Sequence, residues 1–464
     1  MDPVGSERLL EQTTPRRCVR YGTWALWFAS WWGLKCLVLD QDASVYLLCM
    51  SLAVHVRIPP PLGQVPPLMD PLLVYVQGWS SFFCLLFGGL AVQSYLSRGD
   101  ASAMPLGSHW YLLSCLSCGA SSYRRLQDVE HTQRSLRVTT KVTVKRPWLT
   151  KLHPYLYYFF HSVPGHSTDV VIERRSPAGL HVPLDLWYVP STDSALRPVL
   201  FLIHGGAWRG GEARCSPQAP LLQSLAASGF LILSCEYRRR GAAWPMQLED
   251  CSAALEWLIN EGAALYRADP SDVTLAGTSA GGHLAALLLT KLLQDAKFAL
   301  LPRAAMLFYP ALDPSDRFTN STVRLPFSCS PLGVRYKMSA LEWFFQLIVL
   351  HGNEDLWPSA EPMRQLERVD RDCISRWPPT LIVHGDCDGI VPIEHSAHFL
   401  LCLESWAAPS RREDQLLRVP GGRHTFESVY GDLSDCCYNA ALSWLQKIRS
   451  SEHSLNAKPA MCDP

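Results

Sequence analysis

A serine inside a G-x-S-x-G pentapeptide is the feature of this chain that most directly indicates chemistry. Residues 277–281 read Gly-Thr-Ser-Ala-Gly, directly after the apolar run 273–276 and before the leucine- and alanine-rich segment 282–289. A strand, a sharp turn and a helix in this order present a serine hydroxyl at the edge of a sheet. We therefore predict that Ser279 is the nucleophile of an acyl-transfer reaction.

Two later turns supply the acid and the base that a serine nucleophile needs. The apolar run 380–383 leads into His-Gly-Asp-Cys-Asp, and the second aspartate of this turn, Asp388, is the predicted acid. The apolar run 415–419 leads into Pro-Gly-Gly-Arg-His, which makes His424 the predicted general base. The order serine, aspartate, histidine is the chain order of α/β-hydrolase triads and differs from those of chymotrypsin-like and subtilisin-like proteases.

Backbone donors for a developing oxyanion are expected in a small-residue loop upstream. The buried-strand pattern 198–203 runs into His-Gly-Gly-Ala-Trp at 204–208. Small residues let backbone N–H groups approach a substrate oxygen closely. We predict an oxyanion hole formed by the N–H groups of Gly206, Ala207 and the residue after the nucleophile, Ala280.

Other residues near these motifs are expected to have structural roles. Asp386 competes with Asp388 for the role of the acid, but the HG-x-x-D spacing favours Asp388, and Asp386 is expected to cap the loop. His204 is expected to hold the oxyanion loop, and His283 to be packed or hydrogen-bonded. The histidines without a partner pattern, expected in ordinary loop or core positions, are His351, His384, His395 and His398.

The motifs HGGAW, GTSAGG, HGDCDGIVP and GGRH resemble those of serine esterases of the hormone-sensitive-lipase and BD-FAE type, within the α/β-hydrolase superfamily. The likeness covers about residues 165–450 and includes the segment before the nucleophile. Ala207 stands where many members have a third glycine, and Thr278 where many have an acidic residue. Neither difference removes a backbone N–H, so the resemblance still implies an active esterase.

A closer resemblance, to the isoprenylcysteine methylesterase-like branch, rests on the layout of the chain. An apolar N-terminal part is followed by the aromatic segment 155–160 and then by the HGGAW-type and SAGGH-type motifs. This resemblance implies a substrate class, the methyl ester at a prenylated protein C-terminus.

The pattern of apolar runs and helical segments predicts the fold class. Strand patterns alternate with helical segments at 216–228, 247–260 and 280–294, as in an α/β-hydrolase fold, a mostly parallel sheet with helices on both faces. We assign residues 166–450 to this domain and 451–464 to a C-terminal tail. Residues 313–377 interrupt the alternation of strands and helices and are predicted to form a cap. The aromatic cluster 343–345 of this cap either shapes an apolar substrate pocket or packs the cap onto the core.

The N-terminal part is predicted to anchor the chain in a membrane. Within residues 1–100, the stretches 21–39 and 71–96 are apolar and long enough to cross a bilayer, which takes roughly 20 residues. A signal peptide is the competing interpretation of the first stretch, but it lacks a small-residue cleavage site. Residues 101–165 form a basic connector, either lying on anionic lipid or solvated. Arginines lie before the first span and after the second, and the positive-inside rule therefore predicts that the hydrolase lies in the cytosol.

The amino-acid composition limits which partners and cofactors we expect. Lysine and arginine balance aspartate and glutamate at 42 each, so nothing indicates nucleic acid. The 16 cysteines are scattered and fit no small disulfide scaffold, and the one C-x-x-C, at 115–118, lacks the second pair of a zinc site. The predicted reaction needs neither a metal nor an organic cofactor. A sequon at 320–322 would matter only if the domain faced a lumen.

The sequence therefore predicts a membrane-anchored serine carboxylester hydrolase of the endoplasmic reticulum or Golgi. Its expected substrate is a hydrophobic ester, a lipid ester or a prenylcysteine methyl ester, and the sequence leaves the oligomeric state open. Two alternatives remain. An amidase or formamidase would use the same triad, and a membrane adaptor could use the hydrolase fold without catalysis.

Overall fold

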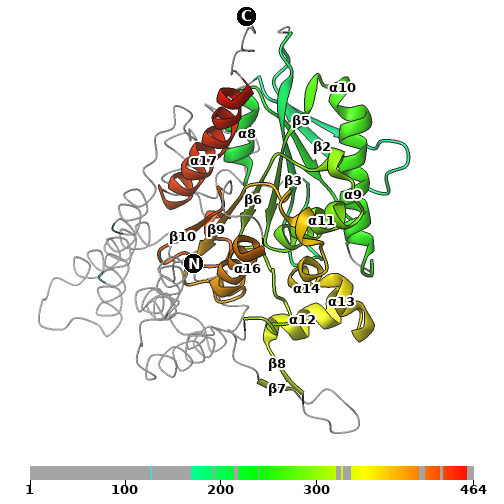
Figure 1. Ribbon diagram of the computed structural model, residues 1–464, viewed down its shortest axis with the longest axis vertical. Coiled ribbons are helices and arrows are strands. Elements are labelled where there is room, and N and C mark those ends of the chain that lie inside the picture. Colours follow the sequence, from blue (N-terminus) through cyan, green and yellow to red (C-terminus); the bar gives the residue numbers. More distant parts are fainter. Residues whose placement is uncertain are drawn as a thin grey trace, which may run out of the picture.

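A computed structural model gives the fold of the chain (Figure 1). It describes residues 169–456, apart from 192–193, 214–217, 240, 320–324, 328–335, 407–412 and 429–431, together with the single positions 116 and 127. Within this part of the chain, no helix has the length and apolar character that a membrane span requires. The predicted spans at 21–39 and 71–96, most of the connector and the sequon asparagine lie outside the described residues.

An eight-stranded sheet forms the centre of the domain, in the order β1-β2-β4-β3-β5-β6-β9-β10. β1 pairs with β2 and β2 with β4 in antiparallel fashion, and the other neighbours are parallel. The strands are β1 (Val171–Arg175), β2 (Leu184–Tyr188), β3 (Arg197–Ile203), β4 (Leu231–Cys235), β5 (Ala268–Thr278), β6 (Ala304–Phe308), β9 (Thr380–Gly385) and β10 (Gln415–Val419). The predicted mostly parallel sheet is confirmed.

Helices cover both faces of this sheet (Figure 1). One face carries α8 (Ala219–Ala227) and α17 (Asp432–Asn456), and the other carries α9 (Met246–Trp257), α11 (Ala280–Gln294) and α16 (Ile393–Trp406). The short helix α10 (Ala263–Leu265) precedes β5. α17 continues beyond residue 450, where the sequence predicted that the domain ends.

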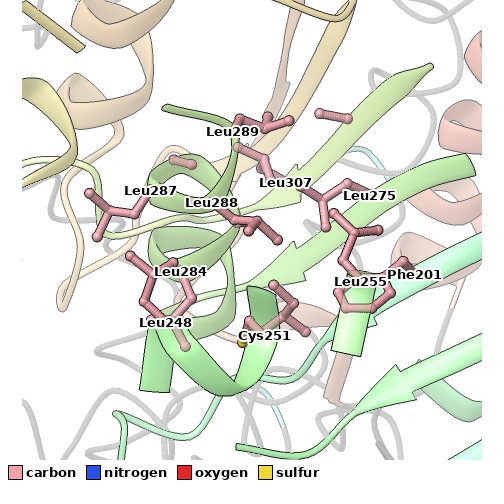
Figure 2. Packing of buried hydrophobic residues seen from close by; sticks show 14 of the residues in the cluster. Phe201, Leu248, Cys251, Leu255, Leu275, Leu284, Leu287, Leu288, Leu289 and Leu307 are labelled. Atoms are coloured by element: carbon pink, nitrogen blue, oxygen red, sulfur yellow. The ribbon is translucent and has the colours of Figure 1, made fainter. Parts of the chain in front are cut away.

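Residues of β3 alternate between two hydrophobic clusters, one on each face of the sheet. Phe201 belongs to the cluster under α9 and α11, whereas its neighbour Leu200 belongs to the cluster under α8 and α17. A strand that is buried on both faces reads as a continuous apolar run, as 198–203 does. Figure 2 shows Leu255 of α9 and Leu288 of α11 gathered with Leu275 of β5 in the first cluster. Each fully buried leucine contributes roughly 1.5–3 kcal/mol to folding.

The segment between β6 and β9 holds the elements of the predicted cap. They are the hairpin of β7 (Leu325–Phe327) and β8 (Tyr336–Met338), followed by α12 (Ala340–Ile348), α13 (Trp357–Ala360), α14 (Pro362–Glu367) and α15 (Arg371–Ile374). Ser339 and Glu342 form a capping box that fixes the start of α12. Phe345 is fully buried in the core cluster, whereas Trp343 is 36% exposed, so the aromatic cluster contributes at least one side chain to packing onto the core.

Candidate active site

The structure brings the three residues predicted as a triad into one hydrogen-bonded line. The Ser279 hydroxyl donates to His424 Nε2 across 2.9 Å, and His424 Nδ1 donates to Asp388 Oδ2 across 2.7 Å. Ser279 follows β5, Asp388 follows β9 and His424 follows β10. The carboxyl ends of these parallel strands meet at one edge of the sheet. In this arrangement His424 can accept the Ser279 proton while Asp388 fixes the tautomer of the ring.

Ser279 occupies a backbone conformation that side chains rarely adopt. Its φ is 51° and its ψ −116°, a conformation that costs roughly 1–3 kcal/mol and persists only where the surroundings impose it. Two hydrogen bonds impose it here: the Ser279 N–H donates to the Phe308 carbonyl across 2.9 Å, and the Ser279 carbonyl accepts from the His283 N–H across 3.1 Å. The serine is thereby fixed between β6 and α11, and it is half-buried rather than enclosed.

Both glycines of the pentapeptide are required by close backbone contacts. A Cβ on Gly277 would lie 2.5 Å from the Gly281 carbonyl oxygen. A Cβ on Gly281 would lie 2.1 Å from the carbonyl oxygen of Ile203, at the end of β3. Either distance is far inside van der Waals contact, so the sharp turn forms only when neither position carries a side chain.

Asp388 is fully buried and surrounded by N–H donors. Its Oδ1 accepts from the N–H groups of Ile390 at 2.9 Å and Val391 at 2.8 Å. Its Oδ2 lies 3.3 Å from Nε2 of a second histidine, His384, in addition to the bond from His424. Burial by itself raises the pKa of Asp388, but the two histidines outweigh it and hold the pKa well below its usual range. Asp388 is thus held as a carboxylate.

The loop predicted to supply oxyanion donors begins beside the serine. A Cβ on Gly205 would lie 3.3 Å from Ser279 Cβ. The backbone of the loop therefore passes directly along the sharp turn at residues 277–281, called the elbow below. The next residues, Gly206 and Ala207, are exposed and have φ of 125° and 52°. Ala280 is the first residue of α11, so its N–H has no partner within the helix and lies at the positive end of the helix dipole.

His204 anchors the start of this loop, in the structural role that the sequence suggested. Its Nε2 lies 3.2 Å from Glu236 Oε1, its carbonyl accepts from the Tyr237 hydroxyl across 3.1 Å, and its ring stacks on the Tyr237 ring. Burial raises the pKa of Glu236, but His204, the Ala213 N–H and the Arg239 guanidinium outweigh it and lower the pKa. A charged, hydrogen-bonded Glu236 therefore ties the loop to the residues after β4.

The turn that carries His424 is held by a second aspartate and by aromatic rings. Asp386 Oδ1 accepts from the Gly421 N–H across 2.6 Å, so Asp386 caps the turn as predicted. The Tyr309 ring lies 4.8 Å from the His424 ring and 5.9 Å from the Phe426 ring, in edge-to-face geometry. These contacts restrict the imidazole to the plane in which it can reach both Ser279 and Asp388.

One buried cluster in the described residues has the residue types of a metal site. Ligand atoms of Asp313, Asp316 and His395 lie within 4.8 Å of one another. The Asp313 N–H donates to His395 Nδ1 across 3.4 Å, so in the neutral ring Nε2 carries the proton and offers no lone pair to a cation. Asp313 Oδ2 already accepts from the N–H groups of Phe318 and Thr319 and from the Thr319 hydroxyl. This donor set does not fit a metal ion.

His384 is the residue beside the triad that the sequence did not single out. Its Nδ1 lies 2.7 Å from Ser396 Oγ, and its Nε2 lies 2.9 Å from the Val391 carbonyl as well as near Asp388. It is a core histidine, as expected, but one whose ring faces the predicted acid. The HG-x-x-D motif contains both residues, and their spacing of four is the signal that could have linked them.

Comparison with known proteins agrees with the fold and with the resemblance. Residues 200–401 match the family model for the alpha/beta hydrolase fold. Esterase LipC of Mycobacterium tuberculosis is 28% identical over 289 residues, which cover 61% of this chain and 65% of that protein. Isoprenylcysteine alpha-carbonyl methylesterase of Arabidopsis thaliana is 27% identical over 315 residues, which cover 63% of this chain and 67% of that protein.

Among solved structures, the chain is similar to the bacterial heroin esterase at 22% identity, covering 69% of this chain and 96% of that chain with a TM-score of 0.48. The chain spans between about half and two thirds of the length of the mycobacterial esterases that it matches. Residues 200–401 of this chain are therefore similar to the alpha/beta hydrolase fold family, and the chain's relatives include esterases.

Proposed function

We propose that this protein is a serine hydrolase of carboxylic esters. The observation that carries the proposal is the unbroken line of hydrogen bonds from the Ser279 hydroxyl through His424 to the buried Asp388 carboxylate. A serine hydroxyl is a weak nucleophile on its own, and a neighbouring histidine with a fixed tautomer activates it. A protein that used this fold only as an adaptor would have no need to keep these three side chains in register.

The reaction proceeds in two steps. Ser279 Oγ attacks the ester carbonyl while His424 takes its proton, and the same proton then passes to the leaving alcohol as the acyl-enzyme forms. Water next attacks the acyl-enzyme while His424 accepts its proton, and this proton then passes to Ser279 Oγ as the carboxylic acid leaves. Asp388 remains ionised throughout and stabilises the imidazolium.

The negative charge on the carbonyl oxygen is stabilised by backbone donors. The N–H groups of Gly206, Ala207 and Ala280 are the proposed oxyanion hole. Removing one donor of such a hole typically costs about 10²- to 10³-fold in rate. The fixed backbone of the elbow and of the HGGAW loop therefore matters to the rate as much as the triad does.

The proposed substrate is a hydrophobic ester held at a membrane, either a lipid ester or a prenylcysteine methyl ester. The apolar stretches 21–39 and 71–96 support a membrane anchor, and an anchor is useful when the substrate is itself in the membrane. The relative named isoprenylcysteine alpha-carbonyl methylesterase supports the second ester class.

The proposed location is an endomembrane, with the hydrolase domain in the cytosol. Arginines that flank the two predicted spans support this orientation. The sequon at Asn320 tests it in cells: a cytosolic domain stays unglycosylated and open to added protease, whereas glycosylation at Asn320 would place the domain in the lumen.

Substrate class is tested with the full chain in membranes, using matched pairs of compounds. We expect hydrolysis of a long-chain p-nitrophenyl ester and of a farnesylcysteine methyl ester, and much slower turnover of the anilide and N-formyl compounds. Ser279→Ala should abolish turnover, whereas Ser228→Ala, which changes an exposed serine, should not. Faster turnover of the amides would replace the proposal with an amidase, and no turnover of any compound by the folded chain would favour the adaptor.

A further inference from the structure

The oxyanion loop has backbone dihedral angles that residues with side chains rarely adopt. Three consecutive residues have positive φ: Gly206 at 125°, Ala207 at 52° and Trp208 at 57°. For a residue with a side chain this region costs roughly 1–2 kcal/mol. Within the loop, the N–H groups of Arg209 and Gly210 donate to the Gly206 carbonyl. Contacts from outside the loop must supply the rest of the restraint.

Trp208 is a second side chain, after His204, through which the loop is held from outside. It is only 4% exposed, although the two residues before it are exposed. Its indole Nε1 donates to His283 Nδ1 across 3.3 Å. Its ring lies edge-on to the rings of His283, at 5.1 Å, and Phe345, at 4.9 Å. The residue next to Ala207 is thus fixed by a hydrogen bond and by two ring contacts.

His283 connects this tryptophan to two other parts of the domain. It lies one helical turn after the serine, and its N–H donates to the Ser279 carbonyl. Its ring Nε2 donates to the Ala360 carbonyl, at the end of α13 in the segment between β6 and β9, across 2.8 Å. Trp208 is 75 residues from His283 in the sequence and Ala360 is 77 residues from it, so one ring joins three distant segments.

The chemistry of the two hydrogen-bond partners permits one protonation state of this ring. An indole N–H only donates and a carbonyl oxygen only accepts, so Nδ1 must be unprotonated and Nε2 must carry the proton. Burial lowers the pKa of His283 to about 4, which agrees with a neutral ring at neutral pH. His283 is therefore a neutral ring with one acceptor and one donor, each of them in use.

We propose that His283 is a positioning residue for the oxyanion hole: through the Trp208 indole it holds the loop in register with Ser279, so that the Gly206 and Ala207 N–H groups face the reacting carbonyl oxygen. The inference rests on the proposed function, because an oxyanion hole matters only to a hydrolase. It also connects the segment between β6 and β9 to the catalytic rate, since the Ala360 carbonyl fixes the tautomer that accepts from Trp208.

Four variants of the full chain in membranes test this proposal, with kcat expressed per serine titrated by a fluorophosphonate. Trp208→Phe keeps an aromatic ring but loses the N–H and part of the buried ring volume. His283→Leu loses both hydrogen bonds, and His283→Gln keeps an acceptor and a donor. Trp377→Phe is the matched control, because Trp377 is also 4% exposed and its indole donates to Thr380 Oγ1 across 2.9 Å, in a part of the core outside the proposed site.

We expect Trp208→Phe and His283→Leu to lower kcat by about 10- to 100-fold, since a misplacement of about 1 Å has an effect of this size. KM should change less than about threefold, because ground-state binding does not use the oxyanion contacts. Affinity for a trifluoromethyl ketone, which mimics the oxyanion, should fall by the same factor as kcat. His283→Gln should recover most of the loss, and Trp377→Phe should leave kcat nearly unchanged.

A purely structural role predicts a different pattern. In that case melting temperature and the number of titrated serines fall, while kcat per titrated serine and affinity for the ketone stay at the wild-type values in Trp208→Phe. This result would overturn the proposal and leave the proposed function intact. A wild-type chain without a titratable serine would instead overturn the proposed function, and this proposal with it.

Discussion

His384 and His424 share one oxygen of Asp388. The Oδ2 atom accepts from His424 Nδ1 at 2.7 Å and lies 3.3 Å from His384 Nε2. The other oxygen accepts from two backbone N–H groups, so both oxygens of the carboxylate are held by donors. The turn and His384 together fix the orientation of Asp388, and Asp388 in turn helps to orient the His424 ring.

This arrangement predicts that the charge of Asp388 matters more than its volume. Asp388→Asn should lower kcat by about 10⁴-fold with little change in KM, because an amide can donate to His424 Nδ1 and select the wrong tautomer. Steady-state kinetics on a p-nitrophenyl ester measure the effect. Asp386→Asn, the matching change two residues earlier in the same turn, should cost less than about tenfold, since Asp386 contacts the turn and not the ring. Equal losses in the two variants would contradict the assignment of the acid.

His384 should act through Asp388 rather than on the substrate. His384→Phe keeps the buried volume and removes the donor, and we expect kcat per titrated serine to fall about tenfold as the carboxylate loses part of its restraint. His384→Gln, which can still donate, should lose less. His398→Phe is a suitable control on the neighbouring helix, where His398 is half-buried and contacts Cys402. An unchanged kcat in His384→Phe would show that the contact has no part in catalysis.

The elbow should not tolerate a methyl group at its second glycine. Gly281→Ala would place a Cβ 2.1 Å from the Ile203 carbonyl oxygen, which is backbone and cannot move aside cheaply. Overpacking of this kind costs typically about 1–3 kcal/mol, so melting temperature should fall and labelling of Ser279 should be lost. At Gly210 a Cβ would come no closer than 3.4 Å to other atoms. Gly210→Ala should therefore melt near the wild-type temperature, and similar melting of the two variants would refute the steric account.

A buried glutamate three residues after His424 predicts how stability depends on pH. Burial raises the pKa of Glu427 to about 8, although its Oε1 accepts from Gln218 Nε2 across 3.0 Å. Between the ordinary value of 4.5 and about 8 the folded state binds more protons than the unfolded state, so the free energy of unfolding falls as pH rises through this window.

Glu427→Gln mimics the protonated form and should remove this loss. At pH 8 we expect the variant to be more stable than wild type by about 4 kcal/mol, with the difference vanishing as pH falls toward the ordinary value of 4.5. Denaturant unfolding at several pH values measures it. The control is Glu413→Gln on the surface, where Glu413 pairs with Lys447 and a change should have little effect. A Glu427→Gln variant that is less stable than wild type at pH 8 would contradict the inferred protonation.

The sheet and the triad could be predicted from the sequence because their signals are local. The buried strand 198–203 appears as a continuous apolar run, and the elbow at Ser279 appears as two glycines around a serine between a strand and a helix. The structure places the three predicted triad residues in contact although His424 lies 145 residues from Ser279. Each of them follows its own strand, and the parallel order of the strands brings the strand ends together.

The contacts that orient these residues could not be predicted in the same way. The ring of His384 faces Asp388 partly because Ser396 on α16 holds its other nitrogen, and the ring of His283 is fixed by Trp208 and Ala360 from distant segments. Such contacts depend on how helices pack over the sheet, and no short-range pattern encodes them. The strands β7 and β8 are also too short to show the alternation of apolar and polar residues from which a hairpin could have been predicted.

Active-site labelling can establish whether Ser279 is the nucleophile of an ester hydrolase. The full chain in membranes is treated with a fluorophosphonate, the adduct is located by peptide mass mapping, and hydrolysis of a p-nitrophenyl ester is measured beside the Ser279→Ala variant. We expect one adduct, on Ser279, and loss of both labelling and hydrolysis in a Ser279→Ala variant that melts like wild type. Hydrolysis that persists in Ser279→Ala, or an adduct on another residue, would contradict this assignment of the nucleophile.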